Sequence, residues 1–158
     1  MPEFRVRVCG DDLVFSAAHF ITFAGGCEPL HGHDYRVAAE VSAALGPDQC
    51  VVDFLALSQL LKTILRGWDH AVLLPAAHPS IRVAAAASEV EVTLDQRRWV
   101  FPRAECRLLP LANTTAELLA EHLALRLREA LRPELGDRPL RVRIELQESP
   151  GRVAVCEA

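Results

Sequence analysis

The chain has 158 residues, of which 51% are hydrophobic and 24% are charged, and its formal net charge is −4. This length predicts a single domain, 1–158, with a buried core. The slight negative charge argues against nucleic acid or an anionic membrane as a partner, and no apolar run approaches the roughly 20 residues that span a bilayer. Five cysteines without close pairs, and a start unlike a signal peptide, predict a reduced cytoplasmic protein.

The N-terminal third of the chain is predicted to form three strands. Residues 4–9 alternate apolar and polar side chains, which is the period of a half-buried strand. After a short turn, residues 13–23 are predicted as a second strand that pairs with the first. The alternation returns at His31, because His31 and His33 share one parity with the apolar positions up to Ala43. The histidine pair is therefore expected at the start of a third strand.

A first helix is predicted after Asp53, a good N-cap whose carboxylate accepts a free backbone N–H. Gly67 is a typical C-terminal stop, and it leaves Asp69 and His70 just beyond the helix. The predicted buried stripe has helical spacing and consists of Phe54, Leu57, Leu60, Leu61, Ile64 and Leu65.

A second helix is predicted from the capping-box pattern Thr114-x-x-Glu117, and Pro133 is expected to end it. Its buried stripe consists of Leu119, Leu123, Leu127 and Leu131. Residues 140–147 and 153–155 alternate again and are predicted as two closing strands. This order of elements predicts an α+β fold with two helices on one face of an antiparallel sheet.

The histidines at 19, 31 and 33 suggest a metal site. Neutral histidine is the commonest metal ligand, and three imidazoles with one open position are typical of catalytic zinc. His31 and His33 leave the same face of an extended segment, with Gly32 between them, and His19 lies in a β-like run that can supply the third nitrogen. Cys27 lies four residues before the pair, within reach of the open side.

Two alternatives stay open from the residues themselves. Each histidine alone is more often a core or surface residue than a ligand. A closed structural zinc site with Cys27 as the fourth ligand is also compatible with the spacing, although structural sites usually contain more cysteine, often in close pairs.

Several motifs occur in an order that resembles the 6-pyruvoyltetrahydropterin synthase and 6-carboxytetrahydropterin synthase family. The resemblance covers nearly the whole chain apart from a stretch near 76–112. The matching segments are Phe15–Phe20, Cys27-x-x-x-His31-Gly32-His33-Asp34-Tyr35, Asp53-Phe54, Asp69-His70, Thr115-x-Glu117 and Glu148-Ser149.

The resemblance implies the family's tunnelling fold, in which the sheets of three subunits join into a barrel and two trimers stack into a homohexamer. It implies a small-molecule pterin substrate, 7,8-dihydroneopterin triphosphate. It also implies one Zn²⁺ per subunit, with His19, His31 and His33 as its protein ligands. The zinc acts as a Lewis acid on the side-chain oxygens of the substrate.

The same resemblance implies roles for further residues. Cys27 is the candidate general base, and Asp69 with His70 is its proton-shuttling partner. Glu148 is the candidate pterin anchor, because a carboxylate accepts two parallel hydrogen bonds from the edge of a pterin, although Glu145 competes for this role. Thr115 and Glu117 align with a pterin-contacting motif, but capping the helix is a sufficient role for Glu117.

The expected reaction follows from the three-residue gap between Cys27 and His31. That gap resembles the bacterial 6-carboxy-5,6,7,8-tetrahydropterin synthases of queuosine precursor synthesis, which release acetaldehyde and triphosphate. The alternatives are a 6-pyruvoyltetrahydropterin synthase, which eliminates triphosphate from the same substrate, and a non-catalytic zinc- or pterin-binding protein.

Residues 81–110 depart from the short connection of the family and are predicted to contain a β-hairpin. Residues 89–94 alternate as a strand, the polar residues at 95–98 turn the chain, and Trp99 and Phe101 share one face of the returning strand. A lone hairpin is marginal in water, so its apolar face needs a surface to pack on. That surface is either the hairpin's own subunit or a subunit interface. In the second case the hairpin could lend an arginine to the triphosphate, namely Arg97, Arg98 or Arg103.

Overall fold

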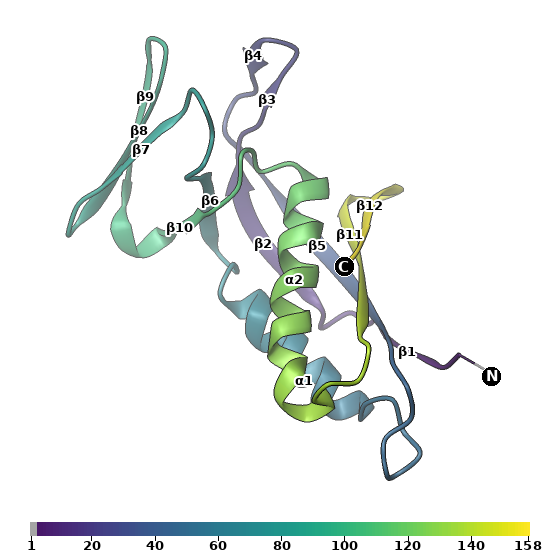
Figure 1. The fold of residues 1–158 in the computed structure, drawn as a ribbon. Coiled ribbons are helices and arrows are strands. Elements are labelled where there is room, and N and C mark those ends of the chain that lie inside the picture. The colour runs from purple at the N-terminus through teal and green to yellow at the C-terminus, as the bar shows by residue number, and fades with distance from the viewer. Residues whose placement is uncertain (1–2) are drawn as a thin grey trace.

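The computed structural model describes residues 3–158 as one seven-stranded sheet, two helices that cover one face of that sheet, and a smaller three-stranded sheet set apart from it (Figure 1). The strand order is β10-β6-β2-β5-β11-β12, and β1 also pairs with β5. The strands of the main sheet are β1 Arg5–Val8, β2 Val14–His19, β5 His31–Ser42, β6 Ala71–Pro75, β10 Cys106–Leu109, β11 Arg141–Ser149 and β12 Arg152–Glu157. The α+β fold with two helices on one face is confirmed.

The predicted pairing of the first two strands is wrong. Both β1 and β2 pair antiparallel with β5, with Val8 opposite Ala39 and Val14 opposite Arg36. The physical reason is the length of β5, whose twelve residues offer a continuous edge to both strands, so that no hairpin forms between them. β2 also ends earlier than predicted, at His19.

The rest of the predicted second strand belongs to a separate small hairpin. Its strands are β3 Thr22–Phe23 and β4 Gly26–Cys27. Ala24 and Gly25 form its turn with φ values of 50° and 78°, a left-handed conformation that glycine adopts without strain.

The main sheet is mixed rather than purely antiparallel. β6 pairs parallel with β2, and β10 pairs parallel with β6. Parallel neighbours need a long connection, which α1 supplies before β6 and the inserted segment supplies before β10.

Helix α1, Phe54–Arg66, begins and ends as predicted. The carboxylate of Asp53 accepts a hydrogen bond from the Ala56 N–H at 2.8 Å, and Gly67 is the C-cap. Leu57, Leu61, Ile64 and Leu65 are buried, whereas Phe54 is 58% exposed. Phe54 is therefore not part of the buried stripe, because at the first helical position its side chain lies beyond the edge of the core.

Helix α2, Ala116–Leu135, differs from its prediction at both ends. Its N-cap is Thr115, whose hydroxyl accepts from the Leu118 N–H, while the Thr114 hydroxyl donates to the Phe20 carbonyl at 3.0 Å. Pro133 lies inside the last turn. There it removes only one backbone hydrogen bond, and the burial of Leu135 favours continuing the helix.

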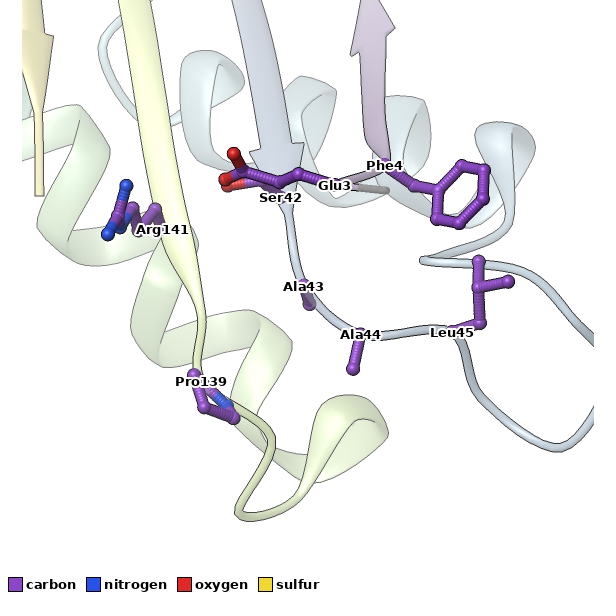
Figure 2. Close-up of a pocket in the computed structure, with 8 residues that line it drawn as sticks. All are labelled: Glu3, Phe4, Ser42, Ala43, Ala44, Leu45, Pro139 and Arg141. Carbon is purple, nitrogen blue, oxygen red and sulfur yellow. The ribbon is translucent and has the colours of Figure 1, made fainter. Parts of the chain in front are cut away.

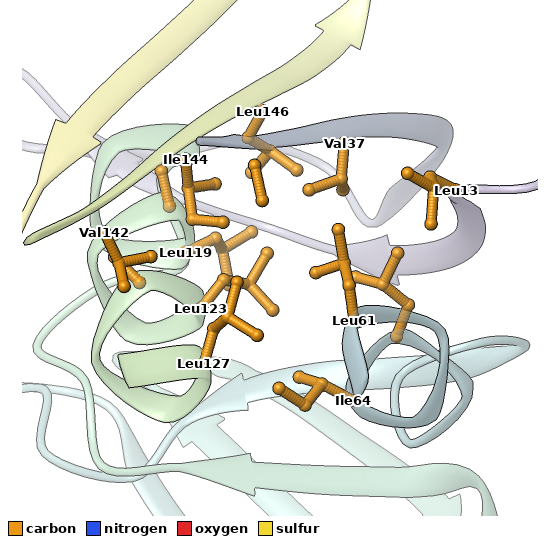
Figure 3. Close-up of a cluster of buried hydrophobic side chains, with 14 of the residues drawn as sticks. Leu13, Val37, Leu61, Ile64, Leu119, Leu123, Leu127, Val142, Ile144 and Leu146 are labelled. Carbon is orange, nitrogen blue, oxygen red and sulfur yellow. The ribbon is translucent and has the colours of Figure 1, made fainter. Parts of the chain in front are cut away.

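The main core lies between the two helices and the sheet (Figure 3). Leucines of α2 meet the alternate residues of β11 and β5 that point toward the helices. The residues of this contact include Leu119, Leu123 and Leu127 of α2, Val142, Ile144 and Leu146 of β11, and Val37 of β5. Within residues 3–158, neither helix is both long enough and apolar enough to span a membrane.

The predicted hairpin of the insertion is confirmed, and its turn is at Asp95 and Gln96. Its strands are β8 Glu89–Leu94 and β9 Arg97–Pro102, and the short 3-10 helix η1 Arg103–Glu105 follows β9. The sequence analysis missed a third strand, β7 Arg82–Ala85, which pairs with β8. The hairpin packs on its own chain, in a second small core where Trp99 stacks on Phe20 with ring centroids 4.7 Å apart.

Candidate metal centre

Three histidines converge at one end of the helix-covered face of the sheet. In the β2–β5 ladder His19 lies opposite His31, and Ala17 lies opposite His33. Opposed residues point to the same face of an antiparallel sheet, so all three imidazoles project together. One ring nitrogen from each lies within 4.8 Å of the others.

Gly32 allows the two strands to come this close. A Cβ atom at Gly32 would lie 3.2 Å from the backbone oxygen of Ala17 on β2. A side chain there would press against the neighbouring backbone and separate His19 from His31. The glycine between the histidines therefore serves the strand pairing that assembles the cluster.

Two of the histidines have their tautomers fixed by backbone carbonyls. The Nδ1 of His19 is 2.8 Å from the Thr114 oxygen, and the Nδ1 of His31 is 2.8 Å from the Pro29 oxygen. A carbonyl can only accept, so each Nδ1 carries the proton and each Nε2 presents a lone pair. Burial lowers the pKa of His19, which keeps that ring neutral. This is the arrangement that second-shell carbonyls give to metal-binding histidines.

The third histidine leaves a buried nitrogen without a partner. Among the described residues, the Nε2 of His33 is a buried side-chain atom with no hydrogen bond. The Tyr35 hydroxyl lies 3.3 Å from the Nε2 of His19, and burial, followed by the Glu148 carboxylate, raises the pKa of Tyr35 well above its ordinary value. A neutral phenol thus backs the cluster. Three imidazoles, one with an unpartnered Nε2, fit a divalent cation such as zinc.

Glu148 borders the same cluster. Its Oε1 lies 3.4 Å from the Nε2 of His19 and 3.4 Å from the Nε2 of His33. These contacts are not ion pairs while the imidazoles are neutral, and a carboxylate oxygen facing a lone pair is unfavourable unless a cation lies between them. Glu145, which competed for the role, binds Arg7 at 2.8 Å and Arg143 at 2.7 Å. Its parity on β11 directs it to the opposite face of the sheet.

Cys27 lies outside the cluster, and its side chain packs against the second small core. The group of ligand atoms within 4.8 Å comprises the three histidines and, among the described residues, does not include the Cys27 thiol. Its Sγ instead donates to the Glu28 carbonyl at 3.3 Å. The geometry thus does not support the closed structural site. Arg97 of the insertion donates to the Cys27 carbonyl at 2.8 Å, so the inserted hairpin contacts this loop directly.

The sequence analysis missed two residues of the site. The carboxylate of Glu28 is 3.8 Å from the Nε2 of His31, which places an acidic group on the same side as the cluster. Thr114 supplies the carbonyl that orients His19. The position of Glu28, directly after Cys27 and three residues before His31, could have indicated its place in the site. The role of Thr114 could not be predicted, because it depends on a backbone carbonyl that every residue has.

Asp69 and His70 lie on the other face of the sheet. Asp69 accepts from the Ser16 N–H at 2.8 Å and lies 3.0 Å from the Nδ1 of His70. The Ser16 N–H bond is the main reason that the pKa of Asp69 is lowered. The ladder directs the side chains of Ser16 and Asp34 away from the histidine side chains. His70 lines a pocket with Ser16 and Asp34, and this pocket also reaches His33. Within one chain, the predicted shuttle therefore does not meet Cys27.

The two remaining predicted contacts lie at the start of α2. Thr115 is committed to its N-cap hydrogen bond, and Glu117 is exposed in the first turn. The preceding carbonyl of Thr114 ties this helix end to His19, so the predicted pair lies near the cluster without a contact to it in the structure.

A large cavity lies far from the histidine cluster. About 660 Å³ opens at the opposite end of β5, between Phe4, Leu45, Pro139 and Arg141 (Figure 2). Its lining contains no histidine or cysteine. Volume alone therefore does not identify the functional site of this chain.

Residues 11–158 match the protein family described as 6-pyruvoyl tetrahydropterin synthase. The chain belongs to this family. Membership implies a lyase with a pterin substrate and an oligomeric assembly, and the histidine cluster agrees with a metal site in such an enzyme.

Relatives within the synthase family include two archaeal proteins. A protein of Pyrococcus abyssi named putative 6-carboxy-5,6,7,8-tetrahydropterin synthase is 28% identical over 138 residues, which cover 86% of this chain and 80% of that protein. A protein of Methanocaldococcus jannaschii with the same name is 28% identical over 121 residues, covering 76% and 74% of the two chains.

Solved structures of synthases share the fold. A 6-pyruvoyltetrahydropterin synthase of Plasmodium vivax superposes with a TM-score of 0.91 at 24% identity, covering 100% of this chain and 99% of that one. The Plasmodium falciparum synthase gives a TM-score of 0.87 at 25% identity, covering 99% and 98%. At 24% identity, the similarity to the Plasmodium vivax synthase shows only that the two proteins share a fold.

Proposed function

We propose that the protein is a zinc-dependent 6-carboxy-5,6,7,8-tetrahydropterin synthase that acts on 7,8-dihydroneopterin triphosphate. The observation that carries the proposal is the cluster of three histidines, two of which have tautomers suited to metal binding, in a chain of the synthase family. The names of the archaeal relatives support the carboxy-type reaction.

The residues of the chain divide the work as follows. His19, His31 and His33 hold the zinc, which when bound supplies a Lewis acid for the side-chain oxygens of the substrate. Glu148 orients the pterin by accepting from its N–H edge. Cys27 removes a side-chain proton, and the hydrogen bond from the Arg97 guanidinium to the Cys27 carbonyl fixes the loop that carries this thiol.

Glu28 is a second candidate base. Its carboxylate is 3.8 Å from a nitrogen of the metal cluster, and one of the solved Plasmodium vivax structures is a variant in which a catalytic glutamate is replaced by alanine. Cys27 packs against the second core whereas the Glu28 carboxylate lies near His31, and single substitutions distinguish the two candidates.

The pair Asp69–His70 enters the reaction through a second copy of the chain. It lies on the face of the sheet opposite the histidines, and Asp69 together with the Ser16 backbone keeps it there. In a barrel made from several such sheets, the open face of one subunit can approach the histidine end of its neighbour. The proposed trimers and hexamer thus complete a site that one chain leaves divided.

Subunit complementation tests this arrangement. Cys27→Ala and His70→Ala are each expected to be inactive alone, whereas co-expressed chains purified through two different tags should regain activity. Random mixing restores both residues at about a quarter of the sites. Turnover per chain is the measurement, and a co-expressed sample as inactive as either parent would place both residues in one subunit.

Glu148→Gln is expected to weaken pterin binding while zinc is retained. One acceptor becomes a donor that faces a donor, and a buried mismatch of this kind costs on the order of 1–3 kcal/mol. Fluorescence titration with a pterin measures the loss. Glu145→Gln is the matched control because its carboxylate is bound by arginines on the other face. Equal affinity in Glu148→Gln and wild type would contradict the anchor role.

Arg97→Ala is expected to lower kcat by up to about tenfold, since a single hydrogen bond of this kind contributes roughly 1 kcal/mol. Arg98→Ala is the control on the same hairpin, because Arg98 pairs with Glu91 and does not contact the Cys27 loop. Equal rates for the two variants would leave the insertion without a role at the loop.

Product analysis decides the reaction. Zinc-loaded protein is incubated with 7,8-dihydroneopterin triphosphate, and the products are assigned by mass spectrometry. Acetaldehyde and a 6-carboxypterin support the proposal. Triphosphate with a 6-pyruvoyl product indicates the alternative elimination, and unchanged substrate with tight pterin binding indicates a non-catalytic protein.

A further inference from the structure

A second pocket, away from the three histidines of the candidate metal centre, is lined by three arginines from three different elements. It has a volume of about 530 Å³ and lies between α2, β10 and the segment after α1. Arg103 comes from η1, Arg107 from β10 and Arg126 from α2, and His122 and Trp68 complete its wall. Nothing in the proposed reaction uses this pocket.

The arginines of this pocket have no acidic partner among the described residues. Within residues 3–158, none of the three forms an ion pair, and the pocket lining contains no acidic residue. Five other arginines do pair with carboxylates: Arg5, Arg7, Arg36, Arg98 and Arg143. Glu105 and Glu121 lie close to Cys106 and His122 but are not part of the pocket lining. Three guanidinium groups that line one pocket without an ion-paired carboxylate are the electrostatic pattern of an anion site.

Arg107 is held in place before any ligand arrives. Its Nε donates to the Gly67 carbonyl, and its Nη1 donates to the carbonyls of Ala104 and Cys106, each at 2.9 Å. Carbonyls fix the guanidinium without neutralising its charge. A cation held this way loses little side-chain entropy on binding, which favours affinity.

The wall next to the arginines is aromatic. His122 stacks on Trp68 with ring centroids 5.7 Å apart and an interplanar angle of 18°. Burial, and then the charge of Arg126, lowers the pKa of His122, so its neutral ring can donate one N–H to an anion without adding to the charge. Arg103 and Arg126 are exposed, and they line the pocket from η1 and α2.

We propose that this pocket binds a phosphate-bearing anion. Guanidinium groups match phosphate oxygens in a bidentate manner, and several arginines with no internal counter-ion favour a multiply charged group over a single carboxylate. Two sources offer this chemistry: the phosphate chain of a substrate bound across a subunit boundary, or free inorganic phosphate or polyphosphate. The site itself does not depend on the proposed reaction; only the substrate source rests on the proposed function.

Titration calorimetry with inorganic triphosphate tests the pocket. The zinc-loaded protein is expected to bind the probe saturably, and Arg103→Gln with Arg126→Gln should weaken binding about tenfold or more, since charge-assisted contacts are lost at two exposed side chains. Arg82→Gln with Arg152→Gln is the matched control, because it removes two exposed arginines elsewhere. No saturable binding, or equal weakening in both double variants, would overturn the proposal.

Kinetics separate the two sources. If the substrate supplies the phosphates, the Arg103→Gln, Arg126→Gln variant raises KM for the pterin triphosphate and leaves kcat near its original value. If the ligand is free, KM is unchanged while calorimetric binding of inorganic triphosphate is lost. Calorimetry on Cys27→Ala keeps the site test independent of turnover, so failure of the proposed reaction does not decide it.

Discussion

His31→Ala is expected to lose bound zinc and turnover together. The imidazole of His31 has its Nδ1 proton fixed by Pro29 and offers Nε2 to the cluster, and alanine leaves only two imidazoles. Changes in the second shell of a metal site alone cost about 10–100-fold in affinity, and removal of a ligand exceeds that. Metal content per chain after dialysis, with the rate on the same samples, measures both losses.

The control for this prediction is His70→Ala. His70 lies on the opposite face of the sheet, so this variant should keep its metal while it loses turnover. Equal zinc retention in His31→Ala and wild type would remove His31 from the ligand set. A bond from Cys27 to the metal in the substrate-free protein would restore the closed structural site.

Cys27→Ala is expected to retain zinc and fold but to lower kcat by roughly 10²–10⁴-fold, the usual contribution of a general base. The thiol lies outside the ligand cluster, so its loss should leave metal content unchanged. Single-turnover rates under saturating substrate isolate the chemical step. Cys50→Ala is the control, since that thiol is exposed and far along the chain from the site.

Glu28→Gln completes the comparison. An amide is nearly the same size as the carboxylate but cannot take a proton. If Glu28→Gln loses turnover while Cys27→Ala keeps it, the base is Glu28. If both lose it, the two neighbours act on the same substrate position. Unchanged product formation in both would place the base elsewhere.

Sequence periodicity predicted where the strands and helices lie better than it predicted which strands pair with one another. The parity of His31, His33 and Tyr35 placed two ligands on the core-facing side of one strand, because a period of two fixes the face. The turn at Asp95 and Gln96 was equally local in origin. Which edge of β5 receives β1 depends on strand length and on the connections, and periodicity carries neither.

The site was predicted in part for the same reason. Ligands that lie on paired strands follow from spacing, whereas the separation of His70 from Cys27 depends on how β6 joins the sheet. β6 pairs parallel with β2 and begins at Ala71, so that the preceding residue shares a face with Ser16. The N-cap of α2 is Thr115 rather than the predicted Thr114, because the Thr114 hydroxyl donates to the Phe20 carbonyl instead.

Because the three histidines lie on two strands, a metal bound by them would cross-link β2 and β5. A ligand that binds only the folded state adds stability by mass action, about 2.7 kcal/mol at a free concentration one hundred times its dissociation constant. The small β3–β4 hairpin joins these strands just beyond the cross-link, so metal occupancy also governs how readily this end opens. Hydrogen exchange of its amides thus reports metal loading in a protein whose helical core stays folded.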